Sequence, residues 1–285
     1  MKATTLVTLM TGLTLAAASS ARASVIVTYA EDPNLVNSSL SGTQVYDFNS
    51  LSTGVNNNVT WSGVGTFDHL YIKNPDVYGG ATDSSHPNGT RYSVQGVGSS
   101  ISSTTLNLDH DSGYFGFWWS AGDASNVLDF YNNGSLVAEF KTSTLLTPLG
   151  PAYDGNPRNR TLDSGEPFAF INFYGDATTV WDQIVFRNAT SSGFESDNYT
   201  SRISTYNPGT DGGTLPGVTV ARVTGTTTTT LSAGTTGAAL WGSTSAIPGA
   251  PAPPMPLIAA FGLVVLLKGR KSLAQRKAEQ AATNV

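Results

Sequence analysis

The chain has 285 residues, a formal net charge of −5 at pH 7 and no cysteine, which excludes disulfides, thiolate zinc sites and cysteine nucleophiles. Charge is unevenly distributed: residues 24–267 hold eight basic and nineteen acidic residues, a net charge of −11. This balance argues against a nucleic-acid partner, because phosphate binding needs a positive surface.

The N-terminus has the pattern of an export signal. Lys2 supplies a positive start, residues 6–18 form a mainly apolar region rich in Leu and Ala, and Ala21 and Ala23 have the spacing of the small residues at a cleavage site. This order is typical of a secretory signal peptide. We therefore expect signal peptidase to remove residues 1–23.

Residues 24–205 carry short β-type runs between clusters of Gly, Asn, Asp, Ser and Thr, and no window keeps helical periodicity for three turns. The pattern predicts an all-β fold, an antiparallel β-sandwich or jelly roll. A barrel or β-solenoid is less favoured, since no fixed repeat occurs. Asn133-Gly134 predicts a tight hairpin turn. The predicted strands are 25–29, 44–48, 65–72, 91–94, 104–108, 114–119, 127–131, 136–141, 168–174, 181–187 and 199–204.

The run 114–119 is aromatic on both of its faces. Alternation places Tyr114 and Trp118 on one side of the strand and Trp119 on the other. One side must face the core, so the other is either covered by loops or exposed as a platform on which a sugar stacks. Tyr114, Trp118 and Trp119 are therefore the candidate glycan-binding residues, and burial on both faces is the alternative.

Several carboxylates are candidates for acid–base chemistry, since glycoside hydrolases use two carboxyl groups about 5 to 10 Å apart. Glu166 and Glu195 are such candidates, but no hydrolase motif surrounds them. Residues 109–111, Asp-His-Asp, are expected to satisfy turn backbone. Glu195 and Asp197 are expected to flank a bulged strand start or to hold a loop. No catalytic residue is predicted, and the protein is not expected to be an enzyme.

Metal and cofactor sites have little support in the sequence. Residues 154–166 offer oxygen ligands suited to calcium, although their spacing does not match an EF-hand. The three histidines, His69, His86 and His110, are far apart, which argues against zinc. We predict no metal and no cofactor.

Residues 206–246 are rich in Gly and Thr, with five consecutive threonines at 226–230. Such sequence buries little apolar surface, so it predicts a flexible linker or stalk, with a single strand allowed at 218–223.

The C-terminal residues 247–271 combine three ordered parts: a proline-rich motif, an apolar run at 257–267 and a basic cluster. Residues 272–285 then form an expected cytoplasmic tail. Eleven apolar residues cover roughly 17 Å, well under the roughly 30 Å of a hydrocarbon core. This length suits a tail that is removed; the alternative is a buried or interfacial C-terminal helix. The predicted processing residues are Pro251, Ala252, Pro253, Lys268, Arg270 and Lys271.

Together the two ends resemble the exosortase-dependent surface proteins of Gram-negative bacteria, whose C-terminal sorting signal is of the Pro-Glu-Pro (PEP-CTERM) type. Ala252 stands where that family usually has Glu. The resemblance implies a short transmembrane sorting helix, cleavage by an exosortase-type protease, an inner-membrane-anchored precursor and a mature form at the cell surface or outside the cell. The segments 114–126, 165–170 and 193–198 are similar to one lineage within this class and imply a lectin-like sandwich.

We therefore expect an exported surface or extracellular-matrix protein without catalytic activity. The alternative is a carbohydrate-binding module that docks on exopolysaccharide, and a third possibility is a polysaccharide-degrading enzyme. An exposed aromatic platform would favour the second function. Two convergent, water-accessible carboxylates in a cleft would favour the third.

Overall fold

The computed structural model of the protein describes residues 23–82, 85–176, 178–188, 192–207, 211 and 215–231. These residues form an all-β fold with two single-turn 3₁₀ helices, Thr142–Thr144 and Pro151–Tyr153. The strands are β1 (Val25–Tyr29), β2 (Gln44–Tyr46), β3 (Gly54–Trp61), β4 (Gly65–Lys73), β5 (Tyr92–Gly96), β6 (Ser103–Ser112), β7 (Tyr114–Ser120), β8 (Val127–Asn132), β9 (Ser135–Lys141), β10 (Ala169–Gly175), β11 (Trp181–Arg187), β12 (Gly193–Arg202), β13 (Val218–Thr224) and β14 (Thr227–Thr230).

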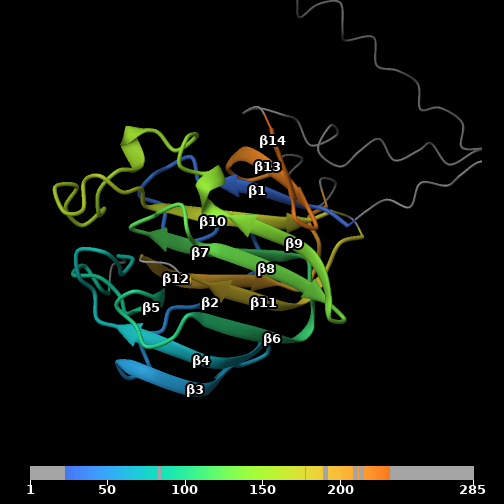
Figure 1. Cartoon of the computed structure of the whole chain (residues 1–285), viewed down its shortest axis with the longest axis horizontal. Helices are drawn as coiled ribbons and strands as arrows, with labels where there is room; N and C mark the ends of the chain where they lie inside the picture. Colours follow the sequence, from blue (N-terminus) through green and yellow to red (C-terminus); the bar gives the residue numbers. More distant parts are fainter. Residues whose placement is uncertain are drawn as a thin grey trace, which may run out of the picture. The chain divides into compact units, whose positions relative to one another are not determined.

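All strand pairs are antiparallel, and the sheet folds over on itself to enclose the core (Figure 1). One layer runs β14-β13-β1-β10-β7-β12, with β2 beside β12. Through β5 it continues into the second layer, β4-β6-β11-β8-β9, with β3 beside β4. At the other edge, the Gly225 N–H donates to the Val137 carbonyl at 2.9 Å and joins the two layers again. This arrangement agrees with the predicted antiparallel β-sandwich.

The main core lies between the two layers and is largely aromatic. Phe115 and Phe117 of β7 contact Phe186 of β11, with ring centroids 5.7 and 6.3 Å apart. Phe173 of β10 packs against Phe130 of β8 at 5.1 Å. Aromatic pairs of this kind add to the stabilisation that comes from burying their area. In a cysteine-free domain, the stability must come from a core of this kind rather than from disulfides.

The outer face of the first layer is also covered. Leu40, Tyr206 and Leu215, from the loops after β1 and β12, form one buried hydrophobic cluster with Tyr114. Trp118 lies in another buried hydrophobic cluster, which includes the loop residues Val36 and Ala81. The candidate glycan platform is therefore wrong: loops cover one face of β7, the core covers the other, and the exposed fractions of Tyr114, Trp118 and Trp119 are 0, 1 and 0%.

Each predicted strand in residues 24–205 overlaps an observed one, and those at 25–29 and 181–187 have the predicted ends. β3 was not predicted, because its asparagines hide the alternation and only Val59 and Trp61 are buried. Residues 109–111 do not form a turn. They lie in the exposed, irregularly paired end of β6.

The sheet extends into the segment expected to be a linker. β13 pairs with β1, and β14 pairs with β13, which places Val220 and Val223 in the core. The expected linker at residues 206–246 therefore contains two strands of the sheet. The threonines of β14 form its edge strand, which suits their β-branched side chains. The segments 1–22 and 232–285, which contain most of the predicted signal peptide and the predicted sorting signal, lie outside the described residues. Within the described part, no helix is long and apolar enough to cross a membrane.

Candidate functional site

β4 and β7 finish at the same end of the sandwich (Figure 1). The hollow with the richest chemistry lies at this end. Its volume is about 270 Å³, and it combines three carboxyl groups, one ammonium group and an aromatic ring. We call it the acidic pocket. The residues that line it are Lys73, Tyr78, Val97, Gly98, Ala121, Asp123, Glu166, Ser192, Gly193 and Glu195.

Strand register brings the three carboxyl groups to this end. Glu195 of β12 pairs with Ser120, the last residue of β7, and Asp123 follows three residues later. The start of β10 pairs with the same end of β7, which places Glu166 nearby, three residues before that strand begins. Residues about 30 and 40 positions apart thus meet because three antiparallel strands end or begin at one place.

A hydrogen bond fastens two of these loops together. The Gly122 N–H donates to the Pro167 carbonyl at 2.9 Å. The first residue precedes Asp123 and the second follows Glu166, so both carboxyl-bearing loops are held at fixed places. Asp123 is further oriented by the Ser125 N–H, which donates to its carboxylate at 2.7 Å.

Glu195 is the most buried of the three acids, with an exposed fraction of 8%. Its carboxyl group folds back over Gly193 and has, among the described residues, no hydrogen-bond partner except its own backbone. The pKa of Glu195 is raised to about 8, mainly by burial; the charges of Asp123 and Glu166 contribute to the rise, while the hydrogen bond from its own backbone and the charge of Lys73 oppose it. Glu195 is therefore mainly protonated at neutral pH.

Glu166 is half-buried on the opposite loop. The pKa of Glu166 is raised to about 7, mainly by burial and in part by the neighbouring carboxyl groups of Asp163 and Asp123. The pocket therefore contains carboxyl groups that oppose one another's ionisation.

The rim of the pocket carries a cation and a ring. Lys73 ends β4, and its ammonium group lies 2.9 Å from the Asp76 carboxylate. The Tyr78 side chain is 48% exposed. Carboxyl and ammonium groups exchange hydrogen bonds with hydroxyl-rich ligands, and an exposed ring offers a face for sugar C–H groups.

Asp197, two residues beyond Glu195, has a structural role. It is fully buried and accepts hydrogen bonds from the Ala81 N–H, at 3.1 Å, and from the Thr90 hydroxyl. Burial raises the pKa of Asp197 to about 8. The side chain holds the loop that covers Trp118, as the sequence led us to expect of Asp197; Glu195 instead lines the pocket.

The loop 154–166 is organised by arginine. The Arg160 guanidinium donates to the carbonyls of Tyr153, Gly155 and Pro33 at 3.0 to 3.1 Å. Within this loop, the carbonyl oxygens of Asp154 and Gly155 are thus already hydrogen-bonded to a cation. Nowhere in the described ranges do three His, Asp or Glu side chains converge as ligands of one metal ion.

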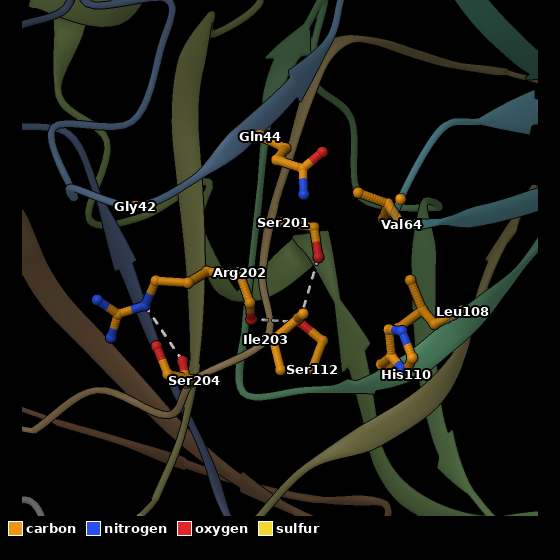
Figure 2. A pocket seen from close by; sticks show the side chains of 11 residues that line it. Gly42, Gln44, Val64, Leu108, His110, Ser112, Ser201, Arg202, Ile203 and Ser204 are labelled. Carbon is orange, nitrogen blue, oxygen red and sulfur yellow. Dashed lines mark hydrogen bonds between the residues drawn. The ribbon is translucent and has the colours of Figure 1, made fainter.

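A second hollow, of about 240 Å³, lies at the opposite end of β7 and β12 (Figure 2). Figure 2 shows Gln44, His110 and Ser112 around it. Arg202 also lines it, but its guanidinium is bound by both carboxylate oxygens of Asp211 at 2.8 Å. This pocket therefore offers mainly neutral polar groups. A larger hollow of about 710 Å³ beside β13 and β14 offers mostly threonines and apolar side chains.

Sequence reasoning identified Glu166 and Glu195 as carboxylates of interest but did not bring them together. It missed Lys73, Tyr78 and Asp123, because the pairing register that unites them is not visible in the sequence. The predicted processing residues are not part of any described site. Ala23 is exposed just before β1, and Ala21, Pro251, Ala252, Pro253, Lys268, Arg270 and Lys271 lie outside the described residues.

No protein-family description and no curated protein matches this chain. Among solved structures, it is similar to the catalytic domain of a GH87 alpha-1,3-glucanase in complex with tetrasaccharides. Sequence identity is 12%, the match covers 66% of this chain and 30% of the glucanase, and the TM-score is 0.28. A likeness at this TM-score carries no conclusion about function.

Proposed function

We propose that this protein is an exported surface or matrix protein whose sandwich domain binds a saccharide in the acidic pocket. The observation that carries the proposal is the convergence of Asp123, Glu166 and Glu195 around one open hollow beside the exposed ring of Tyr78. Carboxyl groups aimed at a small cavity, with an aromatic side chain at its rim, suit a polyhydroxyl ligand. The sequence placed the candidate ligand site on β7, whereas the proposed site lies in the loops that follow the end of that strand.

Export and sorting remain part of the proposal, with exosortase-type cleavage near Pro251-Ala252-Pro253. The order of proline motif, apolar run and basic cluster supports it. Intact-mass analysis of protein extracted from the cell surface should give a chain that starts near residue 24 and ends near this motif. Mature protein that still contained residues 268–285 would contradict the processing.

Saccharide binding is tested on a glycan array with the full chain and two variants. Tyr78→Ser removes the rim ring, and Glu166→Ala removes a half-buried acceptor. Asp111→Ala is the matched control. It removes an exposed carboxylate near the last residue of β6, and Asp111 does not line the acidic pocket. The proposal predicts that the first two variants bind at least tenfold more weakly than the wild type. The control should bind as tightly as the wild type. Binding that is the same in all three variants would place the ligand elsewhere.

A second candidate function is glycoside hydrolysis, favoured by a protonated Glu195 in the same pocket as Asp123. In such a reaction, Glu195 would give its proton to the glycosidic oxygen as the C1–O bond breaks. The Asp123 carboxylate would take a proton from the water that forms the new C1–OH bond. Release of reducing ends from array-positive oligosaccharides, lost in Glu195→Gln, would establish this activity. Binding without such release would establish a binding module.

A further inference from the structure

We propose that the acidic pocket selects saccharides that carry a protonated amine, such as glucosamine units, over their N-acetylated or neutral counterparts. This inference rests on the proposed function of the same pocket and names its ligand class.

The first argument is the imbalance of charge around the cavity. Three carboxyl groups line it, and Asp163 lies against Glu166. The one cationic side chain on the lining is Lys73, whose ammonium group already pairs with Asp76. The Tyr92 hydroxyl nearby donates to the same Asp76 carboxylate at 2.7 Å. The described lining is therefore short of positive charge, and a cationic ligand would supply it.

The second argument is the state of Glu195. It is more than nine-tenths buried and lines the cavity, and among the described residues its carboxyl group has no hydrogen-bond partner except its own backbone N–H. Buried polar groups in proteins are nearly always hydrogen-bonded, so a carboxyl group at a cavity wall that no other residue contacts by a hydrogen bond points to a donor that arrives with a ligand. An ammonium group donates up to three hydrogen bonds and accepts none, which matches carboxyl groups that lose their protons when the cation binds.

The third argument separates an organic cation from a metal ion. A metal ion needs several ligands within about 2.0 to 2.6 Å. No three acidic or histidine side chains in the described ranges are so placed. The carboxyl groups nevertheless influence one another's ionisation across a hollow of about 270 Å³. A hollow of this volume has room for a sugar ring that carries the cation.

The test compares three hexasaccharides by isothermal titration calorimetry against the full chain: the glucosamine oligomer, its N-acetylated form and the β-1,4-glucose oligomer. Spermine serves as a cation without a sugar ring. Measurements run at pH 6.5 in 150 mM salt, which screens the general negative charge of the surface. The proposal predicts that the glucosamine oligomer binds at least tenfold more tightly than the other sugars and than spermine.

Substitutions test whether the carboxyl groups of the acidic pocket cause the preference for the amine. Glu166→Gln and Glu195→Gln should each reduce the preference for the amine about tenfold, whereas Asp111→Asn should leave it unchanged. Circular dichroism melting curves check that each variant is folded, and the half-buried Glu166 is the safer of the two changes. Binding of the amine should also release protons, seen as a buffer-dependent enthalpy, because the ligand favours ionised carboxylates.

The outcomes distinguish the two proposals. Equal affinity for the three sugars would overturn the amine selectivity and leave saccharide binding in place. Spermine that binds as tightly as the glucosamine oligomer, or a preference that survives both Gln changes, would also overturn the selectivity. Absence of binding to any of the sugars would overturn saccharide binding as well.

Discussion

The carboxyl group of Glu195 lies directly over Gly193, so that a Cβ atom added at position 193 would stand 2.0 Å from Oε1. No backbone atom is among the nearest neighbours of that Cβ position; the three nearest atoms all belong to the Glu195 carboxyl group. The absence of a side chain at residue 193 therefore fixes where the buried acid points. This contact links a glycine at the start of β12 to the chemistry of the acidic pocket.

Gly193→Ala should displace the Glu195 carboxyl group and weaken saccharide binding at least tenfold. Its effect on the free energy of unfolding should stay within about 1 kcal/mol, because a flexible side chain can move away. Gly150→Ala is the matched control, since nothing lies within 4 Å of its added Cβ. Calorimetric titration and thermal melting measure the two effects. Unchanged binding in Gly193→Ala would show that the position of Glu195 does not matter to the ligand.

Stability should fall as the pH rises from 5 to 8. The folded-state pKa values of Glu195 and Asp197, about 8, and of Glu166, about 7, lie above the ordinary carboxyl value near 4. In this window the folded protein binds more protons than the unfolded chain, so the free energy of unfolding decreases with pH. Below about pH 4 the trend reverses, because Asp211, with a pKa of about 2, loses its ion pair with Arg202. Melting temperatures measured from pH 3 to pH 8 should peak near pH 5.

Glu195→Gln should flatten this profile. The variant should be more stable than the wild type at pH 8, by an amount on the order of 2 kcal/mol, and similar to it at pH 5, where the buried carboxyl is neutral anyway. Urea denaturation at both pH values provides the comparison. A variant that is less stable at pH 8 would mean that Glu195 is ionised and paired in the folded protein.

Both tryptophans of β7 should be essential for stability. Trp118→Ala and Trp119→Ala should each cost about 3 to 5 kcal/mol, because each ring is buried on its own face of the strand. Trp119→Ala also removes the indole N–H that donates to the Asn126 side chain at 2.8 Å. Urea denaturation measures the loss. If either variant kept stability within 1 kcal/mol, that face of β7 would be accessible after all.

The domain should require residues beyond 217. A chain of residues 24–231 should unfold in one cooperative transition, since it retains β13 and β14. A chain of residues 24–217 should melt at lower temperature and aggregate, because it exposes the paired edge of β1 with its buried Val25 and Val27. Light scattering during heating distinguishes them. If the two chains melted and aggregated alike, β13 and β14 would not contribute to the stability of the domain.

The sequence predicted the strands much better than their surroundings. Alternating apolar residues and the Asn133-Gly134 turn identify strands because side-chain direction repeats every two residues. The same alternation could not tell that loops around Leu40 and Ala81 cover the outer face of β7, since loop packing has no periodic signal. It also could not place Glu166 near Glu195, because pairing register depends on contacts between residues distant in sequence.

The central claim, that the acidic pocket is the saccharide site, is tested most directly by mapping backbone amide NMR shifts during titration with the tightest-binding array oligosaccharide. The account predicts that the largest shifts cluster at Lys73, Tyr78, Asp123, Glu166 and Glu195, with none at the opposite pocket around Gln44, His110 and Arg202. Shifts that cluster instead around that second pocket, or beside β13 and β14, would contradict the account.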